Sequence, residues 1–412
     1  MKNKKILITS LIVLILIIII SISLLFLFRK EEKVIPTKEE LKTTALKAKD
    51  IVTISKIERY ASKDSSNNDE SVYLVKDEAM LTLRNSSLNK IGDSTNLEDS
   101  NNIGLNAALV TAFNSISKVY SSKITTEGDG AKGIYSHGQK SNIELADSTI
   151  ETLGTNSSAL IVNHGLITGE NLTINTKAKS SPALETINKD STIEIKNSTI
   201  ETTSQASPLI FAKGKVSLSN TTGTANGSRI AVLTANANVT LNQVTAIVSG
   251  GSKGNYHESG ILIYDSKNAK TTFTALNSSL NINQSLPYYK IAPLFIVSNA
   301  NAIISLTNTP LNFGSNIFLD INKSTLQLNL DNQNIIGNID STDSKISISL
   351  KNNSILATTI PKDTAITLDK SSTITLQKDT YLSSLNNADK TNSNINFNNH
   401  KLYINNILVE RN

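Results

Sequence analysis

The chain has 412 residues and holds neither cysteine nor tryptophan. The absence of cysteine excludes disulfides, thiolate metal sites and a lipid-modified cysteine. The formal net charge of +5 arises within residues 1–50, which hold ten Lys/Arg and five Asp/Glu, whereas residues 51–412 hold 30 of each. A protein that binds nucleic acid needs a basic face, so the neutral body argues against nucleic-acid binding.

The first predicted element is an uncharged, apolar stretch at residues 6–28, which follows three lysines. As a helix, these residues would span about 34 Å, enough for the roughly 30 Å hydrocarbon core of a bilayer. No small-residue cleavage pattern precedes Arg29, which favours an uncleaved signal anchor over a cleaved signal peptide. Basic residues flank both ends, but long domains translocate largely regardless of charge. We therefore expect a cytoplasmic tail at 1–5, a single-pass membrane helix at 6–28 and an extracellular body at the cell surface.

A charged linker is expected at residues 29–50. Thr37 and Glu40 have the spacing of a capping box, and a short Lys/Glu/Ala/Leu-rich segment follows them. The pattern predicts a short, solvated helix that acts as a stalk between the membrane helix and the body.

The body, placed at residues 51–412, is an internal repeat. Short apolar runs follow small or turn residues at intervals of 21 to 33 residues, most of them close to 25. The runs begin at Leu109, Ile134, Leu160, Leu184, Leu209, Ile230, Ile261, Leu294 and Ile317. Such a period indicates a solenoid, in which each coil buries its apolar face against its neighbours.

A second pattern runs in phase with the first. The segments "NIELADSTIET" (142–152) and "TIEIKNSTIET" (192–202) alternate apolar and polar residues with period two, as half-buried strands do. An Asn or Asp, which tolerates the backbone angles of a bend, separates the two strands of each unit. We expect Ile150, Ile174 and Ile200 to stack in one core column, and the bend amides to hydrogen-bond along the stack. The predicted bend residues are Asp147, Asn171, Asn197, Asn220, Asn242, Asn277, Asn308, Asn332 and Asn352.

Three short strands in a coil of about 25 residues predict an all-β fold, a right-handed parallel β-helix formed as a single-stranded solenoid. A left-handed helix would need six-residue units, and a propeller blade about 40 residues. The chain has room for roughly 12 to 14 coils. Residues 51–70 and the Asn-rich end from about Asn386 are expected to cap the open ends, which would otherwise present sticky strand edges.

The chain carries no recognisable catalytic constellation. His137 and His164 lie 27 residues apart, about one coil, and both precede glycine. We interpret them as solvent-facing turn residues and not as a metal or acid–base pair, because no acidic cluster accompanies them. The acidic segment 92–102 lacks the Gly and terminal Glu of an EF-hand, which predicts a polar loop. We expect no catalytic residue, no metal and no cofactor.

Three coils are long, with extra residues after Lys90, Val248 and Asn281. All three insertions follow the second strand of their repeat, so we expect them at one corner, and insertions on one face of a solenoid often mark its binding face. Exposed tyrosine rings offer an apolar face and a hydroxyl to sugars or partner chains, although the same rings could simply cover the core of a widened coil. The candidate ligand-binding residues are Tyr256, His257, Glu258, Tyr288 and Tyr289.

The repeated "NSTI/NSSL" units, with "ESVYLVKDEAMLTLRNSSLNKIGDS", "GLNAALV", "LSNTTGTANG" and "YYKIAPLFIVSNANAIISLTNTPLNFGS", resemble adhesin-like β-helix surface proteins of Firmicutes of the pectin-lyase-like or carbohydrate-binding type. The resemblance covers roughly residues 70–405 and implies contact with polysaccharide. It supplies no catalytic residues.

The resulting hypothesis is a membrane-anchored cell-surface β-solenoid that is a non-catalytic adhesion or carbohydrate-binding protein. Its partners would be the membrane and polysaccharides or glycans of host or neighbouring cells. Two alternatives stay open: a polysaccharide lyase or hydrolase on the same fold, and a structural surface spacer.

Overall fold

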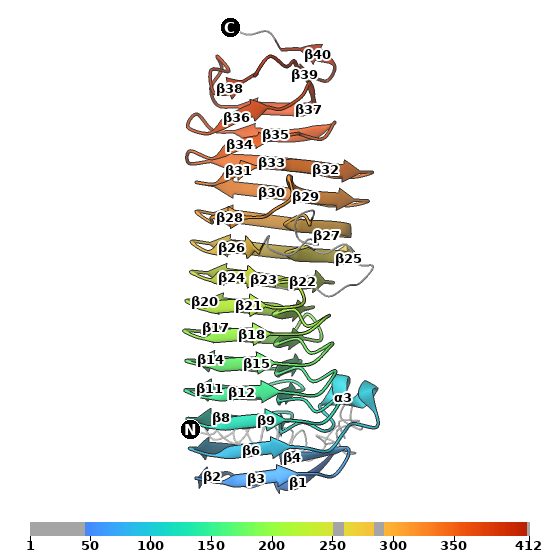
Figure 1. Ribbon diagram of the computed structural model, residues 1–412, viewed down its shortest axis with the longest axis vertical. Coiled ribbons are helices and arrows are strands. Elements are labelled where there is room, and N and C mark those ends of the chain that lie inside the picture. Colours follow the sequence, from blue (N-terminus) through green and yellow to red (C-terminus); the bar gives the residue numbers. More distant parts are fainter. Residues whose placement is uncertain (1–45, 250–258, 284–291, 410–412) are drawn as a thin grey trace, which may run out of the picture. The chain divides into compact units, whose positions relative to one another are not determined.

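The computed structural model describes residues 46–249, 259–283 and 292–409. These residues are nearly all β: short parallel strands are stacked in a repeating, β-helix-like solenoid, with one helix beside them (Figure 1). Each strand pairs with the strand one coil away, as in β12 with β15 and then β18. The predicted parallel solenoid is thus confirmed for the described residues.

Most coils contribute one strand to each of three tracks. In pairing order, the first track comprises β1 (Lys47–Val52), β4 (Glu70–Val75), β7 (Leu109–Thr111), β10 (Ile134–His137), β13 (Leu160–Asn163), β16 (Leu184–Thr186), β19 (Ile210–Ala212), β22 (Ala231–Thr234), β25 (Ile261–Leu276), β27 (Phe295–Thr307), β29 (Ile317–Asn322) and β32 (Asn338–Thr342). The long strands β25 and β27 continue into the second track and so join the two tracks into one 26-stranded sheet.

The second track follows the first within a coil. In pairing order, its other strands are β2 (Lys56–Arg59), β5 (Met80–Arg84), β8 (Ile116–Tyr120), β11 (Asn142–Ala146), β14 (Leu166–Glu170), β17 (Thr192–Lys196), β20 (Lys215–Ser219), β23 (Asn238–Asn242), β30 (Thr325–Asp331), β33 (Lys345–Lys351), β35 (Thr364–Leu368), β37 (Thr380–Asn387) and β39 (Leu402–Ile404).

The third track consists of a ten-stranded and a four-stranded sheet. Its strands are β3 (Ser62–Ser65), β6 (Ser87–Lys90), β9 (Lys123–Thr126), β12 (Thr149–Thr152), β15 (Thr173–Thr176), β18 (Thr199–Thr202), β21 (Thr222–Ala225), β24 (Thr245–Val248), β26 (Ser279–Ile282) and β28 (Leu311–Asn312), followed by β31 (Asn334–Ile336), β34 (Ile355–Thr358), β36 (Thr373–Leu376) and β38 (Ile395–Asn396). One such strand per coil gives fourteen coils, at the upper limit of the expected 12 to 14.

The core is built from in-register columns of aliphatic side chains. Ile174 pairs with Ile150 on one side and Ile200 on the other, and all three are buried, as predicted. Successive residues of a strand point to opposite faces, so the apolar member of each alternating pair faces inward and the polar member faces solvent. In the widened coils, Phe295 packs edge-on against Phe273 and Phe318, with ring centroids 5.6 and 5.7 Å away.

The bend between the second and third tracks has a left-handed backbone in most coils. Residues with positive φ at this bend include Asp147, Asn171, Asn197, Asn220, Gln243, Asn277, Asn308, Asn332 and Asn352. Eight of the nine predicted positions are therefore confirmed. The prediction of Asn242 is wrong by one residue, because β23 extends through Asn242 and Gln243 makes the bend.

Buried hydroxyls follow this bend and satisfy its backbone. Oγ of Ser122 accepts a hydrogen bond from the backbone N–H of Ser86 at 3.0 Å and donates to the carbonyl of Tyr120 at 2.8 Å. Oγ of Ser148 does the same for Ser122, one coil later. Each coil thereby supplies the donor or acceptor that its neighbour would otherwise lack.

The segment 92–102, predicted as a polar loop, instead contains the helix α3 (Leu97–Ile103). The side chain of Asn96 caps its N-terminus by accepting the N–H of Asp99 at 3.1 Å, and Gly104 ends it with φ of 81°. These are ordinary helix-capping signals, which the short and polar sequence obscured.

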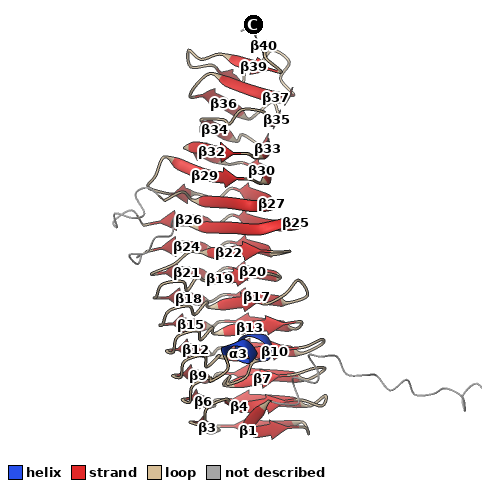
Figure 2. Ribbon diagram, turned by 90° about the vertical axis from the view of Figure 1, so that its right-hand side faces the viewer, coloured by secondary structure: helices blue, strands red, loops and turns tan. Residues whose placement is uncertain are grey.

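Helix α3 covers the outer surface of the first track (Figure 2). Ser100, Tyr135 and Asn163 fasten it: the Ser100 hydroxyl donates to the carbonyl of Gly130, and the other two side chains donate to helix carbonyls at 2.7 and 2.6 Å. Ile103 then packs with the apolar outer residues of this track.

The first coil begins earlier than expected, because β1 starts at Lys47, inside the range 29–50 assigned to the linker. The strands β1, β2 and β3 pair with the next coil, and within the described residues no strand pairs with their other edge. At the other end, β39 pairs antiparallel with β40 (Ile407–Leu408), which closes the last coil with a hairpin.

The predicted membrane helix at residues 6–28 lies outside the described residues, as does most of the predicted linker helix. Among the described residues, no helix has the length and apolar character to span a bilayer.

Candidate functional site

All five candidate ligand-binding residues lie outside the described residues. Tyr256, His257 and Glu258 fall in the range 250–258, and Tyr288 and Tyr289 fall in 284–291. The structure does place the starting points of the insertions: they follow β6, β24 and β26, which belong to the same ten-stranded sheet. The prediction that the three insertions leave from one corner of the coil is therefore confirmed.

A surface groove of about 580 Å³ lies elsewhere, on the outer face of the second track across β11, β14, β17 and β20. Strand register generates it: residues at equivalent outward positions form two parallel columns. The first column contains Glu144, Thr168, Glu194 and Ser217, and the second contains Ala146, Glu170, Lys196 and Ser219. Neighbouring members of a column are about 4.8 Å apart, the spacing of paired strands.

The floor of the groove carries no outward-pointing side chains. Leu145, Gly169 and Ile195 line it between the columns, and they are buried. A side chain at Gly169 would collide with Leu172 and Ile195, since a Cβ there would lie 2.5 and 2.7 Å from their Cδ1 atoms. The groove therefore presents a narrow backbone floor between two polar margins.

Each glutamate of the groove is held by a lysine. Lys118 lies 3.3 Å from Glu144, and Lys196 lies 2.9 Å from Glu170. Lys215 donates to Glu194 at 2.6 Å. These exposed pairs contribute little to stability individually, but they fix the direction of the carboxylates.

Hydrogen bonds hold two of these carboxylates in the charged form. The Tyr120 hydroxyl donates to Glu144 at 2.7 Å and, together with Lys118, lowers the pKa of that carboxyl. The hydrogen bond from Lys196 lowers the pKa of Glu170, and Asn197 adds a second donor at 3.0 Å. A general acid needs a raised pKa, whereas charged carboxylates suit a site that accepts hydrogen bonds from hydroxyl groups.

The expectation that His137 faces solvent is wrong. His137 ends β10 and pairs with Asn163, and it is fully buried beside the rings of Phe113 and Tyr135. Burial, together with the smaller influence of nearby His164, lowers its pKa to about 4. Phe113, from the turn between β7 and β8, packs edge-on against the His137 ring with ring centroids 5.1 Å apart, a contact that sequence spacing alone does not reveal.

His164 occupies the adjacent bend with φ of 63° and is only partly buried. Its Nδ1 lies 3.8 Å from a carboxylate oxygen of Asp190. Residues 46–249, 259–283 and 292–409 contain no group of three or more His, Cys, Asp or Glu side chains that could hold a metal ion.

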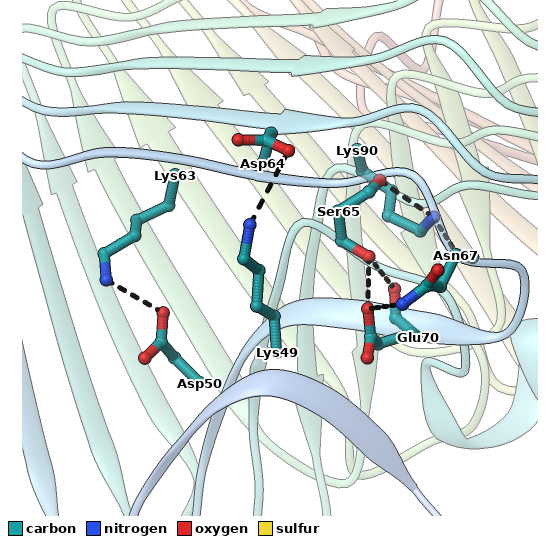
Figure 3. A network of polar contacts seen from close by, with 8 residues as sticks. All are labelled: Lys49, Asp50, Lys63, Asp64, Ser65, Asn67, Glu70 and Lys90. Atoms are coloured by element: carbon teal, nitrogen blue, oxygen red, sulfur yellow. Dashed lines mark hydrogen bonds and ion pairs between the residues drawn. The ribbon is translucent and has the colours of Figure 1, made fainter.

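A buried lysine, Lys90, was missed in the sequence and ends β6, directly before the first insertion. Nζ of Lys90 donates to the carbonyls of Ser65 at 3.3 Å and Asn67 at 2.8 Å (Figure 3). Burial lowers its pKa to about 8, against the opposing influence of Glu70 and two aspartates. Its position was readable in principle, because Lys90 follows Leu88 by two residues and so shares the inward face.

A scan against protein-family models finds no match, and searches of curated proteins and of solved structures find none either.

Proposed function

We propose that this protein is a membrane-anchored cell-surface solenoid that binds polysaccharide along the groove of its second track. The fold would be a right-handed parallel β-helix of the adhesin-like kind, held by a signal anchor at residues 6–28, with the coils outside the cell. The single observation that carries the binding function is the groove on β11, β14, β17 and β20.

The chemistry of the groove supports a hydroxyl-rich ligand. Its margins offer hydroxyls from Thr168, Ser217 and Ser219 and charged carboxylates from Glu144 and Glu170. Sugar hydroxyls both donate and accept hydrogen bonds, so they complement such a mixture. The columns repeat at about 4.8 Å, which suits successive units of an extended polymer better than a single compact molecule.

The tyrosine-bearing insertions enter the proposal as a second contact region. Tyr256, His257 and Glu258 on one insertion, and Tyr288 and Tyr289 on the next, would add ring faces that the polar groove does not offer.

The test uses the full-length chain in detergent on an array of polysaccharides and glycans, with and without Ca²⁺. Thr168→Tyr fills the groove with a ring on the outer face of β14. Thr173→Tyr, on the next strand of the same coil, places the same ring on the outer face of the third track. We expect Thr168→Tyr to weaken binding by about tenfold or more and Thr173→Tyr to leave it unchanged.

Three results would contradict the proposal. Equal loss in both variants would place the contact elsewhere, and absence of any ligand on the array would favour a structural spacer. Release of new reducing ends or unsaturated products from a bound polymer would instead support a hydrolase or lyase.

A further inference from the structure

The first coil exposes an unusual amount of apolar surface. The exposed fractions of Ile54, Ile57 and Tyr60 are 81%, 65% and 78%, and Ile51 is half exposed. No other coil of the described residues exposes as many large apolar side chains. Several large apolar side chains exposed on one coil are candidates for an interaction surface.

These exposed apolar side chains are specific to the first coil, because the residues that pair with them in later coils are polar or buried. Ile57 pairs with Thr82, and the next residues of that outward column are Lys118 and Glu144, which are polar. Ile51 pairs with Leu74, which is buried beneath the α3 insertion. The apolar surface therefore belongs to the end of the solenoid at which the described chain begins.

Basic residues accompany these apolar side chains. Residues 46–65 contain five Lys/Arg and three Asp/Glu. Each of the three acids is paired with a lysine: Asp50 with Lys63 at 3.1 Å, Asp64 with Lys49 at 3.6 Å, and Glu58 with a lysine of the same strand (Figure 3 shows the first two pairs). Pairing neutralises the acids and leaves the coil with a positive balance.

The combination of exposed Ile and Tyr with Lys and Arg is the one that binds the interface of an anionic membrane. Only 17 residues, 29–45, separate the apolar stretch at residues 6–28 from Leu46. Seventeen residues extend at most about 60 Å, and about 26 Å if helical. The proposed anchor would thus keep the first coil within reach of the bilayer throughout.

From these observations, we propose that the first coil is a membrane-docking surface: Ile54, Ile57 and Tyr60 enter the lipid interface, and the basic side chains contact anionic headgroups. The inference rests on the proposed membrane anchor. Docking would hold the first coil on the bilayer and leave the groove several coils away from the lipid surface.

A second copy of the chain is the competing occupant, because no strand of the described residues pairs with the outer edge of the first coil. The ion pairs Asp50–Lys63 and Asp64–Lys49 lie on this coil. Charged side chains at an edge disfavour edge-to-edge pairing, which favours the lipid surface over self-association.

The experiment exploits the absence of tryptophan from the chain. Tyr60→Trp places one tryptophan on the first coil, and Tyr381→Trp places one on β37 near the other end, where the native tyrosine is also exposed. Each full-length variant is reconstituted into nanodiscs of phosphatidylcholine and phosphatidylserine, with or without brominated acyl chains, which quench tryptophan on contact. Circular dichroism verifies that each variant is folded.

We expect brominated lipid to quench Tyr60→Trp by about twofold or more and to leave Tyr381→Trp unaffected. Adding Ile54→Ser and Ile57→Ser to the Tyr60→Trp chain should abolish the quenching. Unquenched emission from Tyr60→Trp in chains that co-elute with nanodiscs would overturn docking and leave the anchor intact. Equal quenching at both ends, or a blue shift that depends on chain concentration and not on lipid, would also overturn it. Failure to co-elute with nanodiscs would refute the anchor itself, and docking with it.

Discussion

Nδ2 of Asn220 donates a hydrogen bond to Oδ1 of Asn197, one coil earlier, at 2.7 Å. Both residues make the same left-handed bend, with φ of 46° and 53°. Asn308 bonds to Asn277 in the same way. Asn197 departs from the pattern by donating to Glu170 at the margin of the groove. These side chains therefore serve both the bend conformation and the stacking of coils.

Replacing Asn220 separates these two contributions. Asn220→Ala loses the side-chain bond and keeps a Cβ in a left-handed bend without the polar group that makes Asn tolerate it, so the free energy of unfolding should fall by about 1–2 kcal/mol. Asn220→Gly loses the bond but tolerates the bend, and should cost less than Ala. Urea unfolding followed by circular dichroism measures both. A glycine variant as destabilised as the alanine variant would show that the left-handed bend contributes nothing.

The core column offers a second comparison. Ile174→Ala removes a buried side chain between two in-register isoleucines and should lower the free energy of unfolding by about 2–5 kcal/mol. Thr173→Ala, its exposed neighbour on the same strand, should change stability by no more than about 0.5 kcal/mol. Similar midpoints for the two variants in urea would contradict the assignment of inward and outward faces.

Acid should lower the free energy of unfolding through protonation of His137. Its pKa is lowered by burial to about 4 in the folded chain, below the ordinary value of 6.5. The unfolded chain therefore binds more protons between these values, so stability is fully present above pH 6.5 and falls as the pH drops toward 4. His137→Asn should flatten this dependence, whereas His400→Asn, at a partly exposed site, should not. The measurement is thermal unfolding between pH 4 and 7, and an unchanged slope in His137→Asn would contradict the account.

Lys90 should produce a separate dependence at high pH. Burial lowers its pKa from 10.5 to about 8, so the unfolded chain binds more protons between these two values. The free energy of unfolding contributed by this group should consequently increase as the pH rises from 8 to 10.5. Lys90→Met should abolish that increase, while Lys123→Met, an exposed lysine in the same track, should retain it. The same increase in all three proteins would assign it to another group.

The repeat made much of this fold predictable. The recurrence of "STIET" fixes the register of β12 and β18, and alternation identifies the inward Ile150, Ile174 and Ile200. Asn and Asp mark the bend because few other residues tolerate its φ. Both signals are local in the sequence. Stacking of the coils then aligns residues at equivalent positions of the repeat in columns.

Features that depend on the insertions were not predictable in this way. Helix α3 is short and polar, and its capping signals were masked by an acidic, loop-like composition. The burial of His137 depends on tertiary packing by Phe113 and Tyr135, which the spacing of the repeat does not show either.

The groove was missed for a different reason. Glu144, Glu170 and Glu194 are separated by 26 and 24 residues, and only register brings them together. The available signal was the recurrence of outward polar residues at the coil period, which is weaker than the alternation that marks the core.

The most direct test of the central claim locates the bound polymer on the solenoid. The chain has no cysteine, so Thr168→Cys and Thr173→Cys each carry a single bimane label on the groove and on the third track of the same coil. During titration with a polysaccharide selected on the array, we expect a saturable change in bimane emission at residue 168 and none at residue 173. A change at residue 173 alone, or at neither position while the polymer remains bound, would contradict binding along the groove.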